Sequence, residues 1–324
     1  MDFPSKDVEN EKQEFEKSFN EMISALPKRK SWGILEDYFQ YQGFWLHPTF
    51  LKGVVSAQQK LQAQSTDIML CNLPKTGTTW LKSLIFAIVT RASFDHSTSP
   101  LLSKLPHELV PFMELYHADF PTYRELGVPV LATHVPYPSL PKSILDSGCK
   151  IVYICRNPKD SFVSLYHFNT AILTSQNLQP LDLDEAFDMF CEGVSIYGPY
   201  WDHVLGYWKA SLAHPDRILF LHYEEMKDDT VLYAKKLAEF IGYPFSSEEH
   251  RQEVPEKIVK MCSFENLSNL EVNRSEKRGV IQNKMYFRKG KVGDWKNYFT
   301  SEMAERLDGI TQQKLSGSGL SIHF

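Results

Sequence analysis

The chain has 324 residues, and its 35 Lys and Arg against 40 Asp and Glu give a formal net charge of −5. Hydrophobic residues make up 43% and charged residues 23%, which excludes disordered, collagen-like and coiled-coil chains and leaves ample material for a large core. The mild negative charge argues against a nucleic-acid partner, and no stretch nears the ~20 consecutive apolar residues that a membrane span requires. We therefore expect a globular protein that binds neither nucleic acid nor a membrane.

Cysteine usage and the N-terminal residues indicate the compartment. The five cysteines are odd in number and include no C-x-x-C pair, which suits reduced thiols better than a disulfide framework or a zinc site. The first residues are acidic and polar, unlike a secretory signal or a basic transit peptide. These features predict a cytoplasmic protein without a metal site.

The chain begins with a charged segment and continues as a globular domain. Residues 1–20 are polar and carry little apolar periodicity, so we expect a flexible tail there. No internal repeat and no long Gly/Ser linker divides the rest. Residues 21–324 are therefore predicted to form a single domain.

Short apolar runs alternate with helical patterns along that domain. The runs are rich in Val, Ile and Leu and nearly continuous, as in strands buried on both faces of a parallel sheet. They cover residues 67–72, 128–134, 150–155 and 217–223, and helices are predicted over 79–91 and 229–241. This alternation predicts an α/β fold with a central parallel sheet flanked by helices.

The strongest motif is LPKTGTTW (residues 73–80), directly after the first predicted strand and before a helix. Its glycine permits a tight turn, while Thr hydroxyls, free N–H groups of the helix start and Lys75 converge on one anion. The motif is not a Walker A loop, because Lys75 precedes Gly77. Taken alone, the motif is better explained as an ordinary strand–turn–helix with a solvated lysine.

Two further segments carry cations that point to phosphate groups. Arg156 ends the third predicted strand, Pro158 begins the next helix, and Ser164 follows within two helical turns. The segment MYFRKGKVGDW (residues 285–295) places two adjacent cations beside a glycine, and Phe264 is placed to stack on a base. A structural salt bridge and a solvated basic turn are the alternatives for these two segments.

Together these segments resemble the cytosolic sulfotransferases, which transfer a sulfuryl group from 3′-phosphoadenosine 5′-phosphosulfate (PAPS) to a hydroxyl group. PKTGTTW is similar to the family's 5′-phosphosulfate loop, YICRNPKDSFVSLYHF to its 3′-phosphate motif, and YFRKGKVGDWKNYF to its C-terminal lid. CSFENLSNLEVN, YGPYWDHVLGYWKAS and KLSGSGL look most like the plant branch, which includes flavonol, brassinosteroid, hydroxyjasmonate and desulfoglucosinolate sulfotransferases.

The resemblance implies a role for each matching residue. It implies a P-loop-like strand–loop–helix that binds PAPS and releases adenosine 3′,5′-bisphosphate (PAP), without a metal. The 5′-phosphate contacts would come from Thr76, Gly77, Thr78 and Thr79; the 3′-phosphate contacts from Arg156, Ser164, Arg288, Lys289 and Gly290; and the adenine contacts from Trp80, Tyr223 and Phe264. Lys75 and Ser263 are also predicted to contact the cofactor.

The resemblance also identifies His134, in LATHVP, as the catalytic base that removes the acceptor's proton, with Lys75 neutralising the leaving group. A lone histidine after a strand would otherwise be read as a core residue. Ala132 stands where animal members carry a Lys, so any extra cation near the sulfuryl group must come from elsewhere.

The acceptor is predicted only as a small planar or apolar molecule with a hydroxyl group, such as a flavonoid, another phenol or a steroid. Aromatic residues assigned to its pocket are Tyr116, Phe120, Tyr137, Phe168 and Tyr286. A divergent P-loop kinase and a non-catalytic binder of an aromatic ligand are the competing functions. A monomer is expected, because Ser301 replaces the central Val of the animal family's short dimerisation segment.

Overall fold

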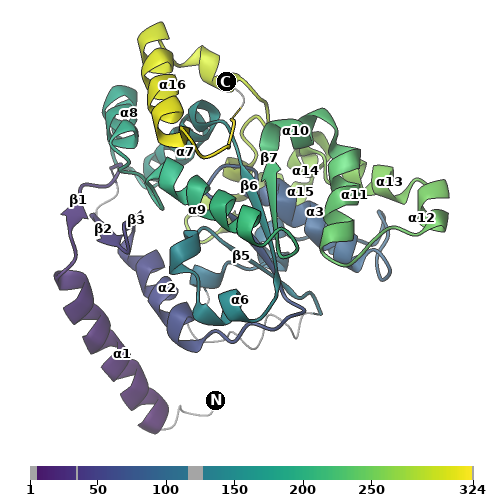
Figure 1. Ribbon diagram of the computed structural model, residues 1–324, viewed down its shortest axis with the longest axis horizontal. Coiled ribbons are helices and arrows are strands. Elements are labelled where there is room, and N and C mark those ends of the chain that lie inside the picture. Colours follow the sequence, from purple (N-terminus) through teal and green to yellow (C-terminus); the bar gives the residue numbers. More distant parts are fainter. Residues whose placement is uncertain (1–5, 34–35, 116–126, 323–324) are drawn as a thin grey trace.

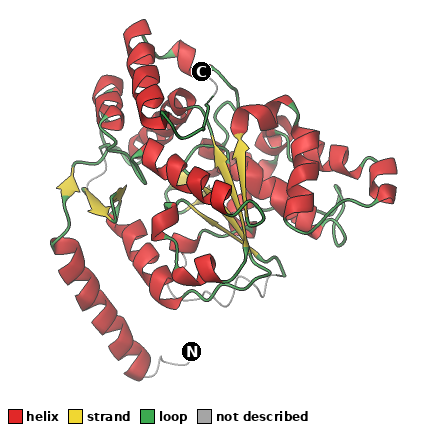
Figure 2. Ribbon diagram, in the orientation of Figure 1, coloured by secondary structure: helices red, strands yellow, loops and turns green. Residues whose placement is uncertain are grey.

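A four-stranded parallel sheet forms the centre of the computed structural model, which describes residues 6–33, 36–115 and 127–322. The strands are β4 (Ile68–Asn72), β5 (Val130–Thr133), β6 (Lys150–Cys155) and β7 (Ile218–His222), in the order β5-β4-β6-β7. Each corresponds to one of the four predicted apolar runs, and the α/β prediction is confirmed (Figure 2).

Alternate residues of each strand belong to two hydrophobic cores on opposite faces of the sheet. Met69, Cys71 and Tyr153 belong to one core, and Leu70 and Val152 to the other. The first core includes residues of α2 (Pro48–Lys60), α7 (Pro158–Ser175), α8 (Leu183–Cys191), α9 (Tyr200–Ala213) and α16 (Ser301–Leu315); the second includes residues of α3 (Thr78–Thr90), α11 (Thr230–Phe240) and α13 (Val254–Met261). Figure 1 shows these two groups of helices on either side of the strands. Burial of both faces explains why the strand sequences are nearly continuous apolar runs.

The predicted tail is helical from Lys6 onward, so that expectation is wrong for its secondary structure. Helix α1 (Lys6–Ser24) runs out from the edge of the fold (Figure 1). Phe19 is only 7% exposed, Met22 and Ile23 pack on the first core, and Glu16 forms an ion pair with Lys52 of α2. The i, i+3, i+4 spacing of these apolar residues is confined to the last turns of the helix. The polar first half of the helix masks this short pattern in the sequence.

Short elements that sequence periodicity did not predict complete the fold. Strands of two to four residues carry too few side chains for a detectable pattern. They are the antiparallel β1 (Lys28–Arg29), β2 (Tyr38–Tyr41) and β3 (Phe44–Leu46), and the pair β8 (Lys277–Arg278) and β9 (Ile281–Gln282). The short helices are α4 (Pro106–Leu109), α6 (Lys142–Asp146), α10 (Tyr223–Asp228), α12 (Ser247–Arg251), α14 (Phe264–Asn269) and α15 (Glu271–Ser275). The 3₁₀ turns are η1 (Pro100–Leu102), η2 (Met113–Leu115), η3 (Tyr137–Ser139), η4 (Asn283–Tyr286) and η5 (Asp294–Asn297). Over the described part of the chain, no helix combines the length and apolarity needed to cross a bilayer.

The contact between α2 and η2 predicts an unequal effect of two Gly→Ala substitutions. A methyl group at Gly53 of α2 would lie 1.8 Å from the carbonyl oxygen of Glu114, whereas one at Gly309 of α16 would meet nothing within 4 Å. Gly53→Ala should therefore lower the free energy of unfolding by about 3 kcal/mol through overpacking. Gly309→Ala should raise it by about 0.5–1 kcal/mol. Urea unfolding followed by circular dichroism measures both, and equal midpoints would contradict the packing described.

Candidate functional site

The loop between β4 and α3 forms an anion-binding turn at the carboxyl edge of the sheet. Gly77 caps α3 with a φ of 112°, and no side chain caps the helix there, so the first N–H groups of α3 remain available. A Cβ at Gly77 would lie 2.9 Å from the ring of Tyr223, which excludes any larger residue. Lys75 also has a positive φ, of 70°. Strained backbone of this kind is typical of functional sites.

Asn72, the last residue of β4, organises the turn and was not predicted. Its side-chain N–H₂ group lies 2.9 Å from Thr76 Oγ1, 2.6 Å from Thr78 Oγ1 and 2.8 Å from the carbonyl oxygen of Leu73. A polar residue at the end of a fully buried strand is the signal that would have identified it. Asn72 thus holds the loop in the shape that presents the helix start.

Thr76 is the one predicted site residue that the structure directs away from the ligand side. Its hydroxyl donates to the carbonyl oxygen of Leu73 and its N–H group to the same oxygen, so both are used within the loop. Thr78 and Thr79 do line a cavity at this edge of the sheet. Thr79 Oγ1 lies 3.0 Å from Nε2 of His107. Direct anion contact by Thr76 therefore stays a prediction.

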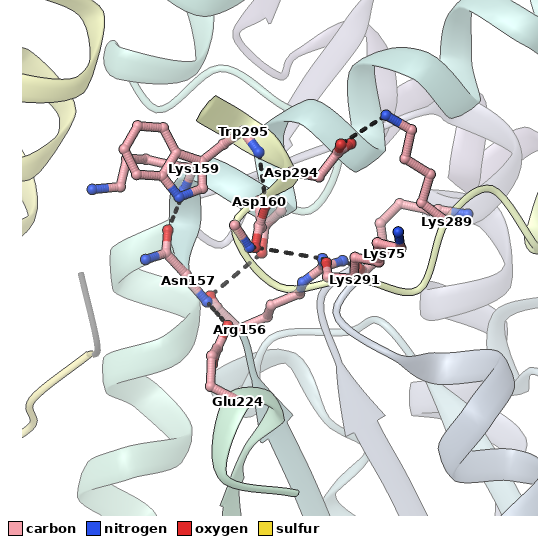
Figure 3. Close-up of polar contacts among 12 residues, drawn as sticks. Lys75, Arg156, Asn157, Lys159, Asp160, Glu224, Lys289, Lys291, Asp294 and Trp295 are labelled. Carbon is pink, nitrogen blue, oxygen red and sulfur yellow. Dashed lines mark hydrogen bonds and ion pairs between the residues drawn. The ribbon is translucent and has the colours of Figure 1, made fainter. Parts of the chain in front are cut away.

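Arg156, at the end of β6, connects the loop after β4 to the C-terminal segment. It donates to the carbonyl oxygen of Lys75 at 3.3 Å and to that of Lys291 at 2.8 Å (Figure 3). Its guanidinium carbon lies 4.5 Å from the centre of the Tyr223 ring, and its Nε is buried without a protein partner. Ser164 lies two turns further along α7 and lines the same cavity, as predicted.

The C-terminal segment 287–295 is held by two aspartates. Asp160 of α7 accepts hydrogen bonds from the N–H groups of Gly293 and Trp295, at 2.7 and 3.0 Å. Asp294 pairs with Arg288 at 2.6 Å and Lys289 at 2.7 Å (Figure 3). Burial would raise the pKa of Asp294, but the hydrogen bonds from Lys289 and Arg288 outweigh it and hold that pKa at about 2. The aspartates thus position the two cations at the cavity.

Aromatic rings form a slot beside these cations. Trp80 meets Tyr223 edge to face, with ring centres 5.6 Å apart. Gly290, with a φ of 61°, packs so closely on Phe264 that a Cβ would lie 2.5 Å from its ring. Ser263 lines the cavity and caps α14 by accepting from the N–H of Asn266. Stacked π-faces of this kind suit a planar base.

Three cations gather around the anion-binding turn. Lys75 Nζ lies 3.9 Å from the centre of the Phe168 ring. Burial and, to a smaller extent, the positive charges of Arg288 and Arg156 together lower the pKa of Lys75 to about 7. A bound anion would offset this repulsion, so the cluster is built for a negatively charged ligand.

His134 follows β5 at the same edge of the sheet. Its Nδ1 lies 2.6 Å from the carbonyl oxygen of Asn72, which can only accept, so Nδ1 carries the proton and Nε2 the lone pair. Burial lowers the pKa of His134 to about 3, although the bond to Asn72 opposes this. The imidazole is therefore neutral and ready to accept a proton at physiological pH.

A cation that was not identified from the sequence, Lys82 of α3, lies near His134 but does not line the cavity. Lys82 is fully buried, donates to the carbonyl oxygen of Val110 at 2.8 Å and lies 3.2 Å from the centre of the Phe112 ring. The Phe112 ring lies 4.8 Å from that of His134. Lys82 thus adds to the lowering of the His134 pKa.

One cavity of about 500 Å³ is lined by every predicted site residue except Thr76. The rest of its wall is mainly apolar and aromatic: Trp32, Tyr38, Phe50, Phe112, Leu115, Phe168, Ile172, Ile196, Tyr197, Ile281 and Tyr286. Phe168 and Tyr286 were predicted there, whereas Tyr137 packs instead on Tyr207 outside the lining. Tyr116 and Phe120 lie outside the described residues.

The fold and the site together define a nucleotide-dependent group-transfer enzyme: an anion-binding turn, an aromatic slot and a neutral imidazole open into one cavity. The family model for the sulfotransferase domain matches residues 65–319. The chain belongs to the sulfotransferase family, in its plant cytosolic branch.

Curated plant relatives match nearly the whole chain. It is 49% identical to cytosolic sulfotransferase 17 of Arabidopsis thaliana, over 94% of this chain and 91% of that protein. It is 50% identical to flavonol 4′-sulfotransferase of Flaveria chlorifolia, over 97% of this chain and 99% of that protein.

Solved structures agree with this fold. An Arabidopsis thaliana putative steroid sulphotransferase is 37% identical with a TM-score of 0.73, over 94% of each chain. A mouse sulfotransferase in complex with PAP is 28% identical with a TM-score of 0.65, over 86% of this chain and 95% of that one.

Proposed function

We propose that this protein transfers a sulfuryl group from PAPS to a hydroxyl group of a small planar, apolar acceptor. The observation that carries the proposal is a single cavity joining the cation cluster of Lys75, Arg156 and Arg288 to the neutral imidazole of His134. The relatives named cytosolic sulfotransferases support the cytosol as its compartment.

The residues around the turn fit PAPS. Gly77 leaves room for a phosphate against the helix start, because any side chain there would meet Tyr223. The Nε atoms of Arg156 and Arg288 are buried and lack protein partners, as donors awaiting a phosphate oxygen would be. Thr78 and Thr79 would hold the 5′-phosphate; Arg156, Ser164, Arg288, Lys289 and Gly290 the 3′-phosphate; and Trp80, Tyr223 and Phe264 the base. PAPS supplies the sulfuryl group and a stable leaving group, PAP.

His134 acts as the general base in this proposal. Nε2 takes the proton of the acceptor hydroxyl as its oxygen bonds to sulfur and the bond from sulfur to the phosphate oxygen breaks. Nδ1 keeps its proton on the carbonyl oxygen of Asn72 throughout. Lys75 neutralises the charge that develops on the leaving oxygen, and the nearby Phe168 and Tyr286 rings favour its charged form.

The apolar wall of the cavity supports a planar acceptor. Rings of Phe112 and Tyr197 lie beside His134, with centres 4.8 and 5.5 Å from the imidazole. Phe168 and Tyr286 extend the surface toward Lys75. A flat phenolic acceptor would bury its rings here with a hydroxyl at Nε2. Two relatives named flavonol sulfotransferases support a flavonoid over a steroid.

We also propose that the protein acts as a monomer. Lys296, Ser301 and Glu305 of the C-terminal segment are all exposed. Such a surface offers little apolar area for a stable interface, and exposed ion pairs contribute only ~0–1 kcal/mol each.

Transfer from radiolabelled PAPS, without added Mg²⁺, tests the function directly. A panel of a flavonol, a simple phenol and a steroid should give the highest kcat/KM with the flavonol, because its flat aromatic rings can pack on the aromatic side chains of the cavity wall. Mg²⁺-dependent phosphorylation by ATP would identify a kinase instead. Ligand binding without transfer would identify a non-catalytic binder.

His134→Ala should abolish transfer while leaving PAP affinity nearly intact. Loss of general-base help typically costs ~10²–10⁴ in rate. His47→Ala is the matched control, because His47 lines the same cavity but pairs with Glu36 at 3.0 Å. Steady-state kinetics and calorimetry measure the two quantities. A His134→Ala enzyme that kept more than about a tenth of its turnover would remove His134 from the mechanism.

The cations should divide into binding and catalytic groups. Arg156→Ala and Arg288→Ala should each weaken PAP binding by about 10–100-fold, since each leaves a phosphate without a charged partner. Lys75→Ala should mainly lower kcat, because its charge matters most as the leaving group forms. Lys291→Ala is the control, because its exposed side chain is on the same segment outside the cavity lining. The reverse pattern would mean that the two phosphate sites are exchanged.

A further inference from the structure

A buried carboxylate lies directly behind the proposed base. Glu114, in η2, is 1% exposed. Its Oε1 accepts from the N–H group of His134 at 2.9 Å and from the hydroxyl of Tyr197 at 3.2 Å, and its Oε2 accepts from the hydroxyl of Thr133 at 2.8 Å. Glu114 thus contacts both the turn that carries His134 and a wall of the acceptor cavity.

All three of these contacts donate hydrogen to Glu114. The N–H of His134 can only donate, and Thr133 Oγ1 already accepts from the N–H of Val135 at 3.0 Å, so its single hydrogen faces the carboxylate. Burial keeps Tyr197 protonated by raising its pKa. Burial also raises the pKa of Glu114, and the hydrogen bonds donated by His134, Thr133 and Tyr197 oppose this rise. The contacts therefore favour the ionised form.

The backbone of Glu114 is fixed as firmly as its side chain. Its carbonyl oxygen lies so close to Gly53 of α2 that no Cβ fits between them. Helix α2 therefore holds η2 against the end of β5, and the carboxylate cannot withdraw from the turn without moving that helix.

We propose that Glu114 is a positioning residue for the general base, an inference that rests on the proposed function. It fixes the backbone turn that keeps Nδ1 of His134 on the carbonyl oxygen of Asn72. Its negative charge also favours the imidazolium that forms when Nε2 takes the acceptor's proton. Glu114 itself stays ionised, and the proton remains on His134 until it is lost to solvent.

The charges around His134 explain why this carboxylate matters. Burial lowers the pKa of His134 most, and Lys82 from α3 and Lys75 from the loop after β4 lower it further, so both lysines oppose a positive charge there. His203 of α9, whose own pKa burial lowers to about 4, is neutral and donates to the carbonyl oxygen of His134 at 3.0 Å. Glu114 supplies the opposite charge at hydrogen-bond distance from the same turn.

Glu114→Gln tests the proposal with two phenolic acceptors of different acidity. 2-Naphthol holds its proton firmly and needs the base, whereas 4-nitrophenol gives its proton up readily. With 2-naphthol, kcat should fall by about 10–100-fold, and with 4-nitrophenol by less than about threefold. PAP affinity and the acceptor KM should stay within about twofold of wild type.

Several outcomes would overturn the proposal that Glu114 positions His134. Equal losses with both acceptors would indicate a general structural defect, and a raised KM with unchanged kcat would make Glu114 an acceptor contact. If His134→Ala is inactive and Glu114→Gln matches wild type, this inference alone is wrong. If His134→Ala remains active, the proposed base is wrong and this inference fails with it.

A matched pair at Thr133 keeps the test decisive if Glu114→Gln does not fold. Thr133→Ser keeps the hydroxyl that donates to Glu114, whereas Thr133→Val removes it with little change in shape. With 2-naphthol, kcat should fall about 3–10-fold for Thr133→Val and stay within about twofold of wild type for Thr133→Ser. The loss of kcat for Thr133→Val should again be smaller with 4-nitrophenol. Equal kcat values for the two variants would overturn the proposal.

Discussion

The hydrogen bond from Nδ1 of His134 to the carbonyl oxygen of Asn72, 2.6 Å long, joins the ends of two neighbouring parallel strands, and the site is arranged around it. On one side, Asn72 uses its side chain to shape the anion-binding turn. On the other, the same residue's backbone sets the tautomer of the imidazole. Because β4 and β5 run in register, the anion site and the proposed base cannot move independently. Reaction geometry is thus a property of the sheet edge rather than of a mobile loop.

Positive charge is concentrated in the site, and a few buried carboxylates pair with it. Burial, together with the charges of Arg288 and Arg156, depresses the pKa of Lys75. Asp160 counters this at the start of α7, where it lies 3.6 Å from Arg156 and ties down the backbone of Gly293 and Trp295 (Figure 3). Carboxylates hold these cations on the side opposite the cavity, and the cations face the cavity. Such a cluster binds an anion strongly because its side chains need little reorganisation on binding.

The acceptor wall has a different origin from the nucleotide side. Most residues proposed to bind the nucleotide follow strands or begin helices, and Arg288, Lys289 and Gly290 lie between η4 and η5. The wall collects side chains from segments as far apart as Trp32, Phe50, Tyr197 and Tyr286. Tyr197 packs on Phe50 with ring centres 5.8 Å apart, and Tyr286 on Phe168 at 5.5 Å. Wall residues in loops and short turns can change without disturbing the sheet, so acceptor preference is the property of this fold that varies most easily.

The sequence by itself determined the strands and the anion-binding turn, because continuous apolar runs and a Gly-containing turn leave a local signature. The motifs that resemble a sulfotransferase pointed to His134, Arg156 and Arg288. Only the tertiary structure decided the helical state of α1 and the parts of Asn72, Lys82 and Glu114. Each of these depends on a partner far along the chain: Lys52 for α1, the end of β5 for Asn72 and Glu114, and the carbonyl of Val110 for Lys82. The role of a buried polar side chain depends on the group that forms a hydrogen bond with it, and long-range packing decides which group that is.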